Sequence, residues 1–301
     1  MLTGPLLTVV RPGPLTTVQD LGRPGYAHLG VPPSGAVDPD SLRSANRKAG
    51  NLQAAAGLET TLRGVAFRLS EPRRVAVTGA VAPVTLDGEP VELPAVIPAG
   101  AVLDVGAATA GLRSYVAVAG GIDVPPVLGS RSTDRLSGLG PAPLRDGDEI
   151  PLGPDVPAPD PVWAGDWYAH SPPADDPFPR EIRLLLHPGP RDDWLTPRAW
   201  ELLATAAWTV TPDTDRVGVR LAGPRPDRAR PGELPSEGLV TGAVQVPPDG
   251  RPVVFLADHP TTGGYPVAGV VEATGALAQA RPGTIVRFVV GRHVTGWRVA
   301  G

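Results

Sequence analysis

Residues 16–50 read TTVQDLGRPGYAHLGVPPSGAVDPDSLRSANRKAG, and the rest of the chain is organised around this stretch. Its first half, residues 19–26, brings an amide, a carboxylate, a guanidinium and a phenol into eight positions. Its second half predicts a helix after Asp38, because Pro suits the first helical position and an Asp before it caps backbone N–H groups. Gly50 is expected to end this helix in a left-handed conformation. A long polar loop fixed to a short capped helix is typical of a functional site on a rigid scaffold.

The composition is that of a globular protein with a substantial apolar core. Of 301 residues, 42% are hydrophobic and 19% are charged, with a net charge of −4. This negative net charge gives no indication of a nucleic-acid-binding surface. The chain has no cysteine and five dispersed histidines, so we expect no disulfide, no Cys nucleophile and no metal site. No secretory signal and no membrane-spanning run are present, which favours a cytoplasmic location.

Short apolar runs bounded by Gly and Pro predict a mainly β protein, either a barrel or a sandwich. The expected strands are residues 6–10, 75–78, 102–105, 115–119, 182–186, 253–256 and 285–290. The pair Asp87-Gly88 predicts a tight hairpin. A second hairpin is expected at Asp249-Gly250, and a second helix is expected after Thr196, which would cap it.

The chain divides around a segment dense in Pro and Asp. We expect a first lobe at 1–153, a linker at 154–180 and a second lobe at 181–301. The two lobes contain similar stretches, because residues 98–105 (PAGAVLDV) resemble residues 281–288 (RPGTIVRF). These similarities favour an internal duplication.

Three further segments concentrate polar groups among glycines, and each is a candidate site. Residues 113–134 join a strand to a Gly-Gly turn and a Ser/Thr-rich stretch, where N–H groups and hydroxyls can hold an anion. Residues 236–245 place Glu237 and Gln245 in an otherwise small and apolar stretch. Residues 258–266 (DHPTTGGYP) combine an acid, a histidine, two hydroxyls and a tyrosine. Ordinary turns remain an alternative explanation for the first segment.

Several long motifs in order resemble the KipA family, also called allophanate hydrolase subunit 2. They are the stretch 16–51, RSYVAVAGGIDVPPVLGSRSTD (113–134), HPGP (187–190), DRVGVRLAG (215–223) and SEGLVTGAVQVPPDGRPVVFLADHPTTGGYP (236–266). The family comprises biotin-dependent carboxyltransferase subunits, and its bacterial members serve as the C subunit of 5-oxoprolinase. The resemblance covers nearly the whole chain.

The resemblance implies two cyclophilin-like β-barrel lobes with a few short helices. It also implies a KipI-like partner (allophanate hydrolase subunit 1) and a LamB/YcsF-like partner, which with this chain perform ATP-dependent cleavage of 5-oxoproline to L-glutamate. Two alternatives stay open: the carboxyltransferase half of a urea carboxylase or allophanate system, and a KipA-type regulatory binder of a KipI-like protein. Met1 is the only methionine, so no biotin-carrier motif exists here and biotin would have to come on another chain. Whether ATP binds this chain stays open.

Opening a lactam needs positive charge or N–H donors near the developing charge, and a base that positions water. Asp20 and Asp258 are the candidates for the base or for an orienting group, and Arg23 and Arg113 are the candidate charge stabilisers. The candidate substrate-binding residues are Gln19, Tyr26, Ser130, Thr133, Glu237, Gln245, Thr262 and Tyr265. Gly120, Gly121 and Arg131 are the candidates for nucleotide binding. Asp38 is interpreted mainly as a helix cap, and Glu59 is left open between the site and the solvent.

Overall fold

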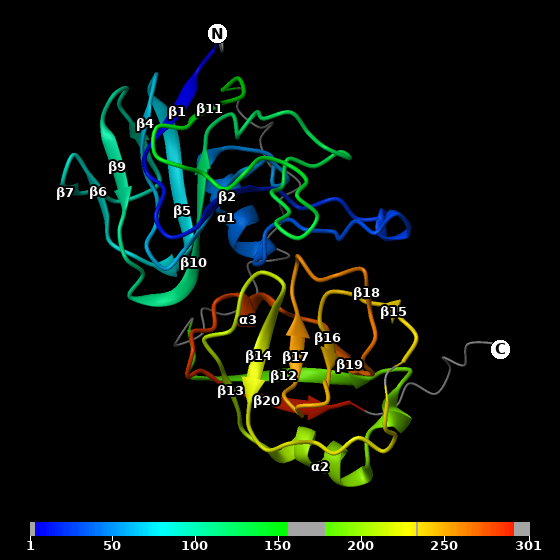
Figure 1. Cartoon of the computed structure of the whole chain (residues 1–301). Coiled ribbons are helices and arrows are strands. Elements are labelled where there is room, and N and C mark those ends of the chain that lie inside the picture. Colours follow the sequence, from blue (N-terminus) through cyan, green and yellow to red (C-terminus); the bar gives the residue numbers. More distant parts are fainter. Residues whose placement is uncertain (1–3, 156–177, 233, 292–301) are drawn as a thin grey trace. The chain divides into compact units, whose positions relative to one another are not determined.

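The computed structural model describes residues 4–155, 178–232 and 234–291 (Figure 1). Its Cα positions form two compact units. Unit 1 comprises Met1–Pro24 and Ser34–Phe178, and unit 2 comprises Gly25–Pro33 and Pro179–Gly301. Residues 156–177 of the expected linker lie outside the described part of the chain. Nothing in the sequence patterns indicates that residues 25–33 belong with the second half of the protein.

Unit 1 consists of two antiparallel sheets and one long helix. The first sheet has the order β11-β1-β4-β9-β6-β7 and the second has the order β2-β3-β10-β5-β8. The strands of the first sheet are β1 (Leu6–Arg11), β4 (Ala66–Leu69), β6 (Val84–Leu86), β7 (Glu89–Pro90), β9 (Val102–Val105) and β11 (Glu149–Pro151). Those of the second are β2 (Thr16–Gln19), β3 (Gly57–Thr61), β5 (Arg73–Val81), β8 (Ala95–Ile97) and β10 (Ala110–Val118).

One apolar core takes side chains from both sheets of unit 1. Leu7 and Phe67 come from the first sheet, and Leu58 and Val116 come from the second, all completely buried. Alternate residues of a strand point to opposite faces, so each strand places its apolar half in this core.

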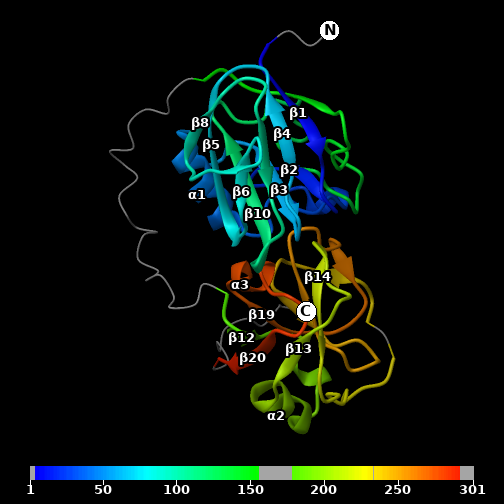
Figure 2. The same ribbon diagram turned by 90° about the vertical axis from the view of Figure 1, so that its left-hand side faces the viewer.

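Helix α1 (Pro39–Ala49) covers the other face of the second sheet, where it packs on β5 and β10 (Figure 2). Leu42, Ala45 and Ala49 form its apolar face, and they contact Tyr115 and its neighbours on the sheet. Asp38 caps the helix because its carboxylate accepts a hydrogen bond of 3.1 Å from the Ser41 N–H. Gly50 ends it in the left-handed conformation. The predicted helix, its Asp38 cap and its end at Gly50 are therefore confirmed.

Unit 2 contains a closed barrel with the strand order β12-β19-β16-β17-β14-β13-β20. Strands β12 and β20 run parallel, and the other described pairs are antiparallel. The barrel strands are β12 (Glu181–Pro188), β13 (Trp208–Val210), β14 (Gly218–Ala222), β16 (Ala243–Gln245), β17 (Val253–Phe255), β19 (Val267–Val271) and β20 (Ile285–Val290). The remaining elements are η1 (Ala27–Leu29), η2 (Asp192–Trp194), α2 (Pro197–Thr205), α3 (Gly275–Ala278), β15 (Glu237–Gly238) and β18 (Thr262–Gly263).

The structure confirms a mainly β protein with a few short helices, and every expected strand lies within or overlaps an observed one. The Asp87-Gly88 turn joins β6 to β7, with both residues at positive φ, as a two-residue hairpin requires. At Asp249-Gly250 the connection between β16 and β17 is longer than a tight turn, although the two strands do pair. Helix α2 begins after Thr196 as expected. The helix ends at Thr205.

The suggested duplication is not visible in the strand pairing of its best sequence match. Strand β9 pairs antiparallel with β4 and β6, whereas β20 pairs parallel with β12 and antiparallel with β13. The duplication stays a prediction. None of the helices in the described residues has the length and apolar character needed to cross a bilayer.

Candidate functional site

The Asp20 carboxylate is the centre of a hydrogen-bond cluster in unit 1. Its Oδ1 accepts from the Ser130 hydroxyl at 2.6 Å and from the Ser132 hydroxyl at 2.5 Å. Its Oδ2 accepts from the Arg131 N–H at 2.6 Å, and Oδ1 also accepts from the Gly22 N–H. Four neutral donors therefore hold the charge of Asp20, and the carboxylate fixes the course of residues 130–132.

Gln19 and Arg23 are anchored on the same segment as Asp20. The Gln19 amide nitrogen donates to the Thr17 hydroxyl and to the Thr133 carbonyl oxygen, each at 3.0 Å. Arg23 donates through Nη2 to the Ser132 carbonyl oxygen and through Nε to the Val127 carbonyl oxygen. The structure thus brings together five predicted site residues: Gln19, Asp20, Arg23, Ser130 and Thr133.

Three atoms of this cluster are buried but make no hydrogen bond within the described residues. They are Oε1 of Gln19, Nη1 of Arg23 and Oγ1 of Thr133. The three residues are 0%, 1% and 2% exposed. Leaving a buried polar group unsatisfied costs about 1–3 kcal/mol, and native proteins rarely collect such groups in one place. This cluster, which we call the Gln19–Arg23–Thr133 cluster, is therefore the best candidate for binding a small polar ligand.

Arg113 belongs to a different network, on the α1 side of the second sheet. It forms a buried ion pair with Glu59, with 3.7 Å between Nε and Oε1. Oε2 of Glu59 accepts from the Tyr115 hydroxyl and from the Val37 N–H, both at 2.9 Å. The Tyr115 oxygen in turn accepts from the Asp38 N–H. The sequence did not decide whether Glu59 faces the site or the solvent. In the structure it is buried, and its hydrogen bonds join the start of α1 to the sheet.

Burial is the main reason why the pKa of Tyr115 lies well above its ordinary value of 10.0. The negative charge of Glu59 raises it further. The phenol therefore stays protonated near neutral pH and donates its proton to the Glu59 carboxylate. The polar groups of Glu59, Tyr115 and Asp38 face one another in this network, and the role of Arg113 as a charge stabiliser stays a prediction.

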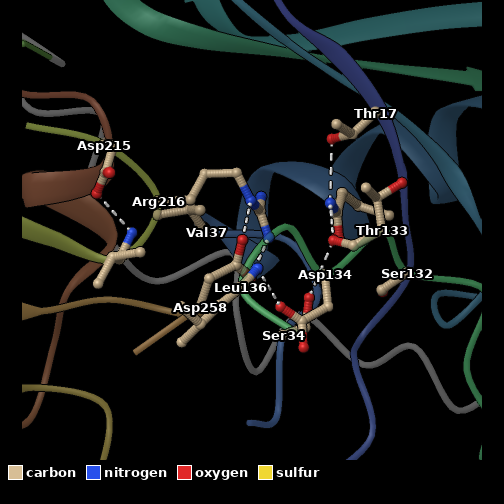
Figure 3. A network of polar contacts seen from close by, with 12 residues as sticks. Thr17, Ser34, Val37, Ser132, Thr133, Asp134, Leu136, Asp215, Arg216 and Asp258 are labelled. Atoms are coloured by element: carbon tan, nitrogen blue, oxygen red, sulfur yellow. Dashed lines mark hydrogen bonds and ion pairs between the residues drawn. The ribbon is translucent and has the colours of Figure 1, made fainter. Parts of the chain in front are cut away.

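Asp258 in unit 2 forms a buried bidentate ion pair with Arg216 (Figure 3). Nε of Arg216 donates to Oδ2 at 2.8 Å and Nη2 donates to Oδ1 at 2.9 Å. The side chains of Arg216 and Asp258 are 3% and 1% exposed. This fork-to-fork geometry neutralises the carboxylate and holds both oxygens, which does not suit a general base.

The other predicted residues of unit 2 lie on or beside β15, β16 and β18, where Gln245 contacts Tyr265 and β15 pairs with β18. Gln245 is buried on β16, and its amide nitrogen donates to the Tyr265 carbonyl oxygen at 2.8 Å. Thr262 is exposed on β18, opposite Gly238 on β15. Glu237 pairs with Arg191, and this hydrogen bond lowers the pKa of the Glu237 carboxyl. Next to Asp258, burial lowers the pKa of His259.

Tyr26 precedes η1, and its carbonyl oxygen accepts from the Leu29 N–H at 2.9 Å. It belongs to unit 2, whereas Gln19, Asp20 and Arg23 belong to unit 1. The compact group expected at residues 19–26 is therefore divided between the two units. Which role Tyr26 plays stays a prediction.

The three residues expected to contact a nucleotide make hydrogen bonds within the chain, and their nucleotide-binding role stays a prediction. The Gly120 N–H donates to Oδ1 of Asn51, and the Gly121 N–H donates to the Val118 carbonyl oxygen. Arg131 donates through Nε to the Val124 carbonyl oxygen and through Nη2 to Asp123. The N–H groups of Gly120 and Gly121 and the Nε and Nη2 groups of Arg131 are thus engaged inside the protein. The positive φ of both glycines serves a tight turn, where a Cβ on Gly120 would lie 2.4 Å from the Gly153 carbonyl oxygen.

Sequence reasoning missed two residues that matter for these sites. Ser132 bonds both the carboxylate and the N–H of Asp20, and Arg216 neutralises Asp258. Both residues lie inside motifs on which the family resemblance rests. The sequence therefore pointed to these segments, but it did not show which side chains Ser132 and Arg216 would contact. Among the described residues, no group of three or more His, Asp or Glu side chains is arranged to hold a metal ion.

The comparisons with known proteins agree with the sequence motifs. Residues 29–290 match the family described as carboxyltransferase domain, subdomain A and B. The C subunit of 5-oxoprolinase from Escherichia coli K12 is 37% identical, over 94% of this chain and 91% of that protein. The urea amidolyase of Lachancea kluyveri is 34% identical over 93% of this chain. The crystal structure of the K. lactis urea amidolyase aligns with a TM-score of 0.84 and 30% identity over 96% of this chain.

The lengths covered differ strongly between these relatives. This chain covers 17% of the L. kluyveri protein and 19% of the K. lactis chain, so it corresponds to one part of each urea amidolyase. It covers almost all of the E. coli protein. Together, the family match and the full-length relative show that this chain belongs to the carboxyltransferase domain, subdomain A and B, family.

Proposed function

We propose that this chain is the C subunit of a multi-subunit 5-oxoprolinase. In this role it takes part in the ATP-dependent cleavage of 5-oxoproline to L-glutamate, a cyclic amide hydrolysis. A KipI-like protein and a LamB/YcsF-like protein complete the enzyme, and the chain is active only with them. The cytoplasmic location expected from the sequence belongs to the same proposal.

One observation carries this proposal: the match to the 5-oxoprolinase protein of E. coli extends over nearly the full length of both proteins. The equivalent 5-oxoprolinase protein of Haemophilus influenzae is 32% identical over 90% of this chain and 87% of that protein. Both 5-oxoprolinase proteins are thus matched over most of their own length. A urea amidolyase carries the equivalent region inside a much longer chain.

The geometry of unit 1 supports a small amide as the ligand. The Gln19–Arg23–Thr133 cluster offers an acceptor, a cationic donor and a hydroxyl, all shielded from water. Asp20 holds the segment that carries Ser132 and Thr133, so it acts as a positioning residue in this proposal. Asp258 is neutralised by Arg216, and the expected role as base has no geometric support at either aspartate.

ATP belongs to the complex as a whole in this proposal. Because the donors of Gly120, Gly121 and Arg131 are engaged within the chain, we assign the nucleotide to a partner protein. No step of the reaction is therefore derived from nucleotide contacts on this chain.

The test is reconstitution with the KipI-like and LamB/YcsF-like proteins of the same genome. We expect the three-protein complex to release glutamate from 5-oxoproline only when ATP is present, and omission of this chain should abolish the release. Asp20→Asn should reduce turnover strongly, whereas Asp40→Asn, whose carboxylate is 77% exposed, should not. A complex that assembles but releases no glutamate above the ATP-free control would disprove the proposal.

A second candidate function is the carboxyltransferase half of a urea carboxylase. The TM-score of 0.84 against the K. lactis urea amidolyase favours it. Biotin would then be supplied by another chain. Carboxylation of urea by a complex with a biotin-carrying partner, without glutamate release from 5-oxoproline, would select this alternative.

A further inference from the structure

We infer that the Gln19–Arg23–Thr133 cluster is a subsite for an H–N–C=O group, the edge presented by a lactam or a ureide. This inference rests on the proposed function, because a lactam is the substrate of a 5-oxoprolinase. It goes further by assigning one protein group to each side of the amide: Oε1 of Gln19 to the N–H and Nη1 of Arg23 to the oxygen. Urea and the ureido ring of biotin present the same edge.

The orientation of the Gln19 amide follows from its hydrogen bonds. Its nitrogen carries two hydrogens, and both are used, on the Thr17 hydroxyl and on the Thr133 carbonyl oxygen. A flipped amide would place an acceptor against the Thr133 carbonyl oxygen, so the network fixes the assignment. Oε1 is therefore the end left for a ligand, and an oxygen at this position accepts an N–H.

Arg23 supplies the opposite polarity. Nε and Nη2 are anchored on the carbonyl oxygens of Val127 and Ser132, which leaves Nη1 as the nitrogen that makes no bond within the described residues. Since a guanidinium has no acceptor, this nitrogen can only donate, and an amide oxygen is a suitable partner. A positive charge shielded from water also stabilises negative charge that develops on that oxygen.

The two side chains are anchored on the carbonyl oxygens of neighbouring residues. Arg23 bonds the carbonyl oxygen of Ser132, and Gln19 bonds the carbonyl oxygen of Thr133. The two anchoring carbonyl oxygens belong to adjacent residues, so both side chains are fixed by one short segment. The Thr133 hydroxyl belongs to the second of these residues, and the Ser34 hydroxyl steadies the same carbonyl oxygen at 3.1 Å (Figure 3).

The pairing of an acceptor with a donor selects the ligand class. A carboxylate has only acceptor oxygens and would set one of them against Oε1 of Gln19. An amide edge presents one donor and one acceptor side by side, and it satisfies both groups at once. The segment that displays them is held in advance by the four donors on Asp20, which lowers the cost of binding.

The experiment compares two buried threonines that differ in one respect. Thr16 and Thr133 are 0% and 2% exposed, but the Thr16 hydroxyl donates to the Pro12 carbonyl oxygen at 2.6 Å. Thr133→Val and Arg23→Lys are introduced into the full chain, with Thr16→Val as the control. The KM of the reconstituted complex for 5-oxoproline is measured, and the binding of 5-oxoproline, urea and biotin methyl ester to the full chain is measured by calorimetry.

We expect Thr133→Val and Arg23→Lys to raise KM or Kd at least tenfold, and Thr16→Val to change it less than twofold. Thr133→Val should leave the Tm unchanged or higher, because it removes a hydroxyl that makes no hydrogen bond within the described residues, whereas Thr16→Val should lower it. This second readout keeps the test informative if Arg23→Lys does not fold.

The outcomes separate the subsite from the proposed function. If the complex turns over 5-oxoproline but both variants behave like Thr16→Val, the subsite is wrong, the cluster holds ordered water only, and the function stands. If 5-oxoproline is not turned over but urea or biotin methyl ester binds and the variants lose that binding, the subsite stands and the function fails. If no turnover and no binding occur, both are wrong.

Discussion

Asp20 and Asp258 look alike in the sequence, since each follows an apolar strand and opens a glycine-containing polar stretch, but the structure uses them differently. Asp20 is held by two hydroxyls and two backbone N–H groups, and no cation pairs with it in the part of the chain that the structure describes. Asp258 is held by both arms of the Arg216 guanidinium.

The difference teaches how a buried carboxylate can be stabilised for two purposes. The neutral donors around Asp20 leave its negative charge in place. The carboxylate in turn fixes the backbone segment that supplies these donors, next to the unsatisfied ligand-binding atoms. A bidentate arginine cancels the charge of Asp258 and joins two segments of unit 2. The first arrangement prepares a site, and the second holds a fold together.

The largest expected effect is on the ion pair of unit 2. Arg216→Met removes the cationic partner of a carboxylate that is 1% exposed, so we expect the free energy of unfolding to fall by about 3–5 kcal/mol. Denaturation in urea measures it, with Arg220→Met on the exposed position of β14 as the control. The double variant Arg216→Met/Asp258→Leu should recover most of the loss. A loss no greater than that of Arg220→Met would contradict the importance of this pair.

The corresponding change in unit 1 should cost less. Asp20→Asn keeps the shape but replaces one acceptor oxygen by a donor that faces the donors around it, so we expect a loss of about 2 kcal/mol. The measurement is again urea denaturation, with Asp40→Asn as the control. A loss as large as that of Arg216→Met would mean that Asp20 and Asp258 are not stabilised in different ways.

Glu59 is an intermediate case, because its partners are both a cation and neutral donors. Tyr115→Phe removes one of these donors, and we expect a loss of about 1–2 kcal/mol at pH 7. Since the folded pKa of Tyr115 is raised above 10.0, the unfolded chain loses the phenol proton first. The stabilisation is present below pH about 10 and is lost as the pH rises toward the folded pKa.

Stability measured between pH about 9 and about 11, on either side of the ordinary tyrosine pKa, checks this prediction. The wild type should lose stability over this range more steeply than Tyr115→Phe, whereas Tyr26→Phe, at a half-buried tyrosine, should follow the wild type. Parallel profiles for wild type and Tyr115→Phe would be inconsistent with a buried, protonated phenol.

The smallest expected effect is at Asp38, whose carboxylate accepts from the N–H and the hydroxyl of Ser41. Asp38→Ala removes this helix cap, and the expected cost is about 1 kcal/mol. Thermal unfolding measures it, with Asp38→Asn, which retains a capping oxygen, as the matched control. If both variants lose several kcal/mol, Asp38 does more than cap the helix.

Features with local causes could be predicted from the sequence. The Asp38 cap, the Gly50 stop and the Asp87-Gly88 hairpin depend on a few neighbouring residues, and the structure contains all three. Gln19, Arg23 and Thr133 were also selected in advance, because they lie in polar, glycine-rich segments. The fold class followed in the same way from short apolar runs.

The partners of the selected residues could not be predicted. Gly120 and Gly121 looked like a phosphate-binding turn because Gly-Gly after a strand often is one, but Asn51 uses the Gly120 N–H from 69 residues away. Asp258 was a candidate base because its partner could not be recognised in the sequence. That partner, Arg216, lies 42 residues earlier, in a stretch with no sign of the pairing. Such contacts depend on strand order and register, which alternation patterns do not specify.

The sequence by itself therefore determined the β character, the capped helix, the family and the short list of polar residues, since each depends on neighbours in the chain. Only the tertiary structure decided which of those residues meet. It placed Asp20 on Ser130 and Ser132 across 110 and 112 residues, and it left Gln19, Arg23 and Thr133 with unsatisfied atoms in one cluster. The physical reason is that these hydrogen bonds join loops that lie far apart in the sequence, and which loops become neighbours is fixed only when the whole core packs.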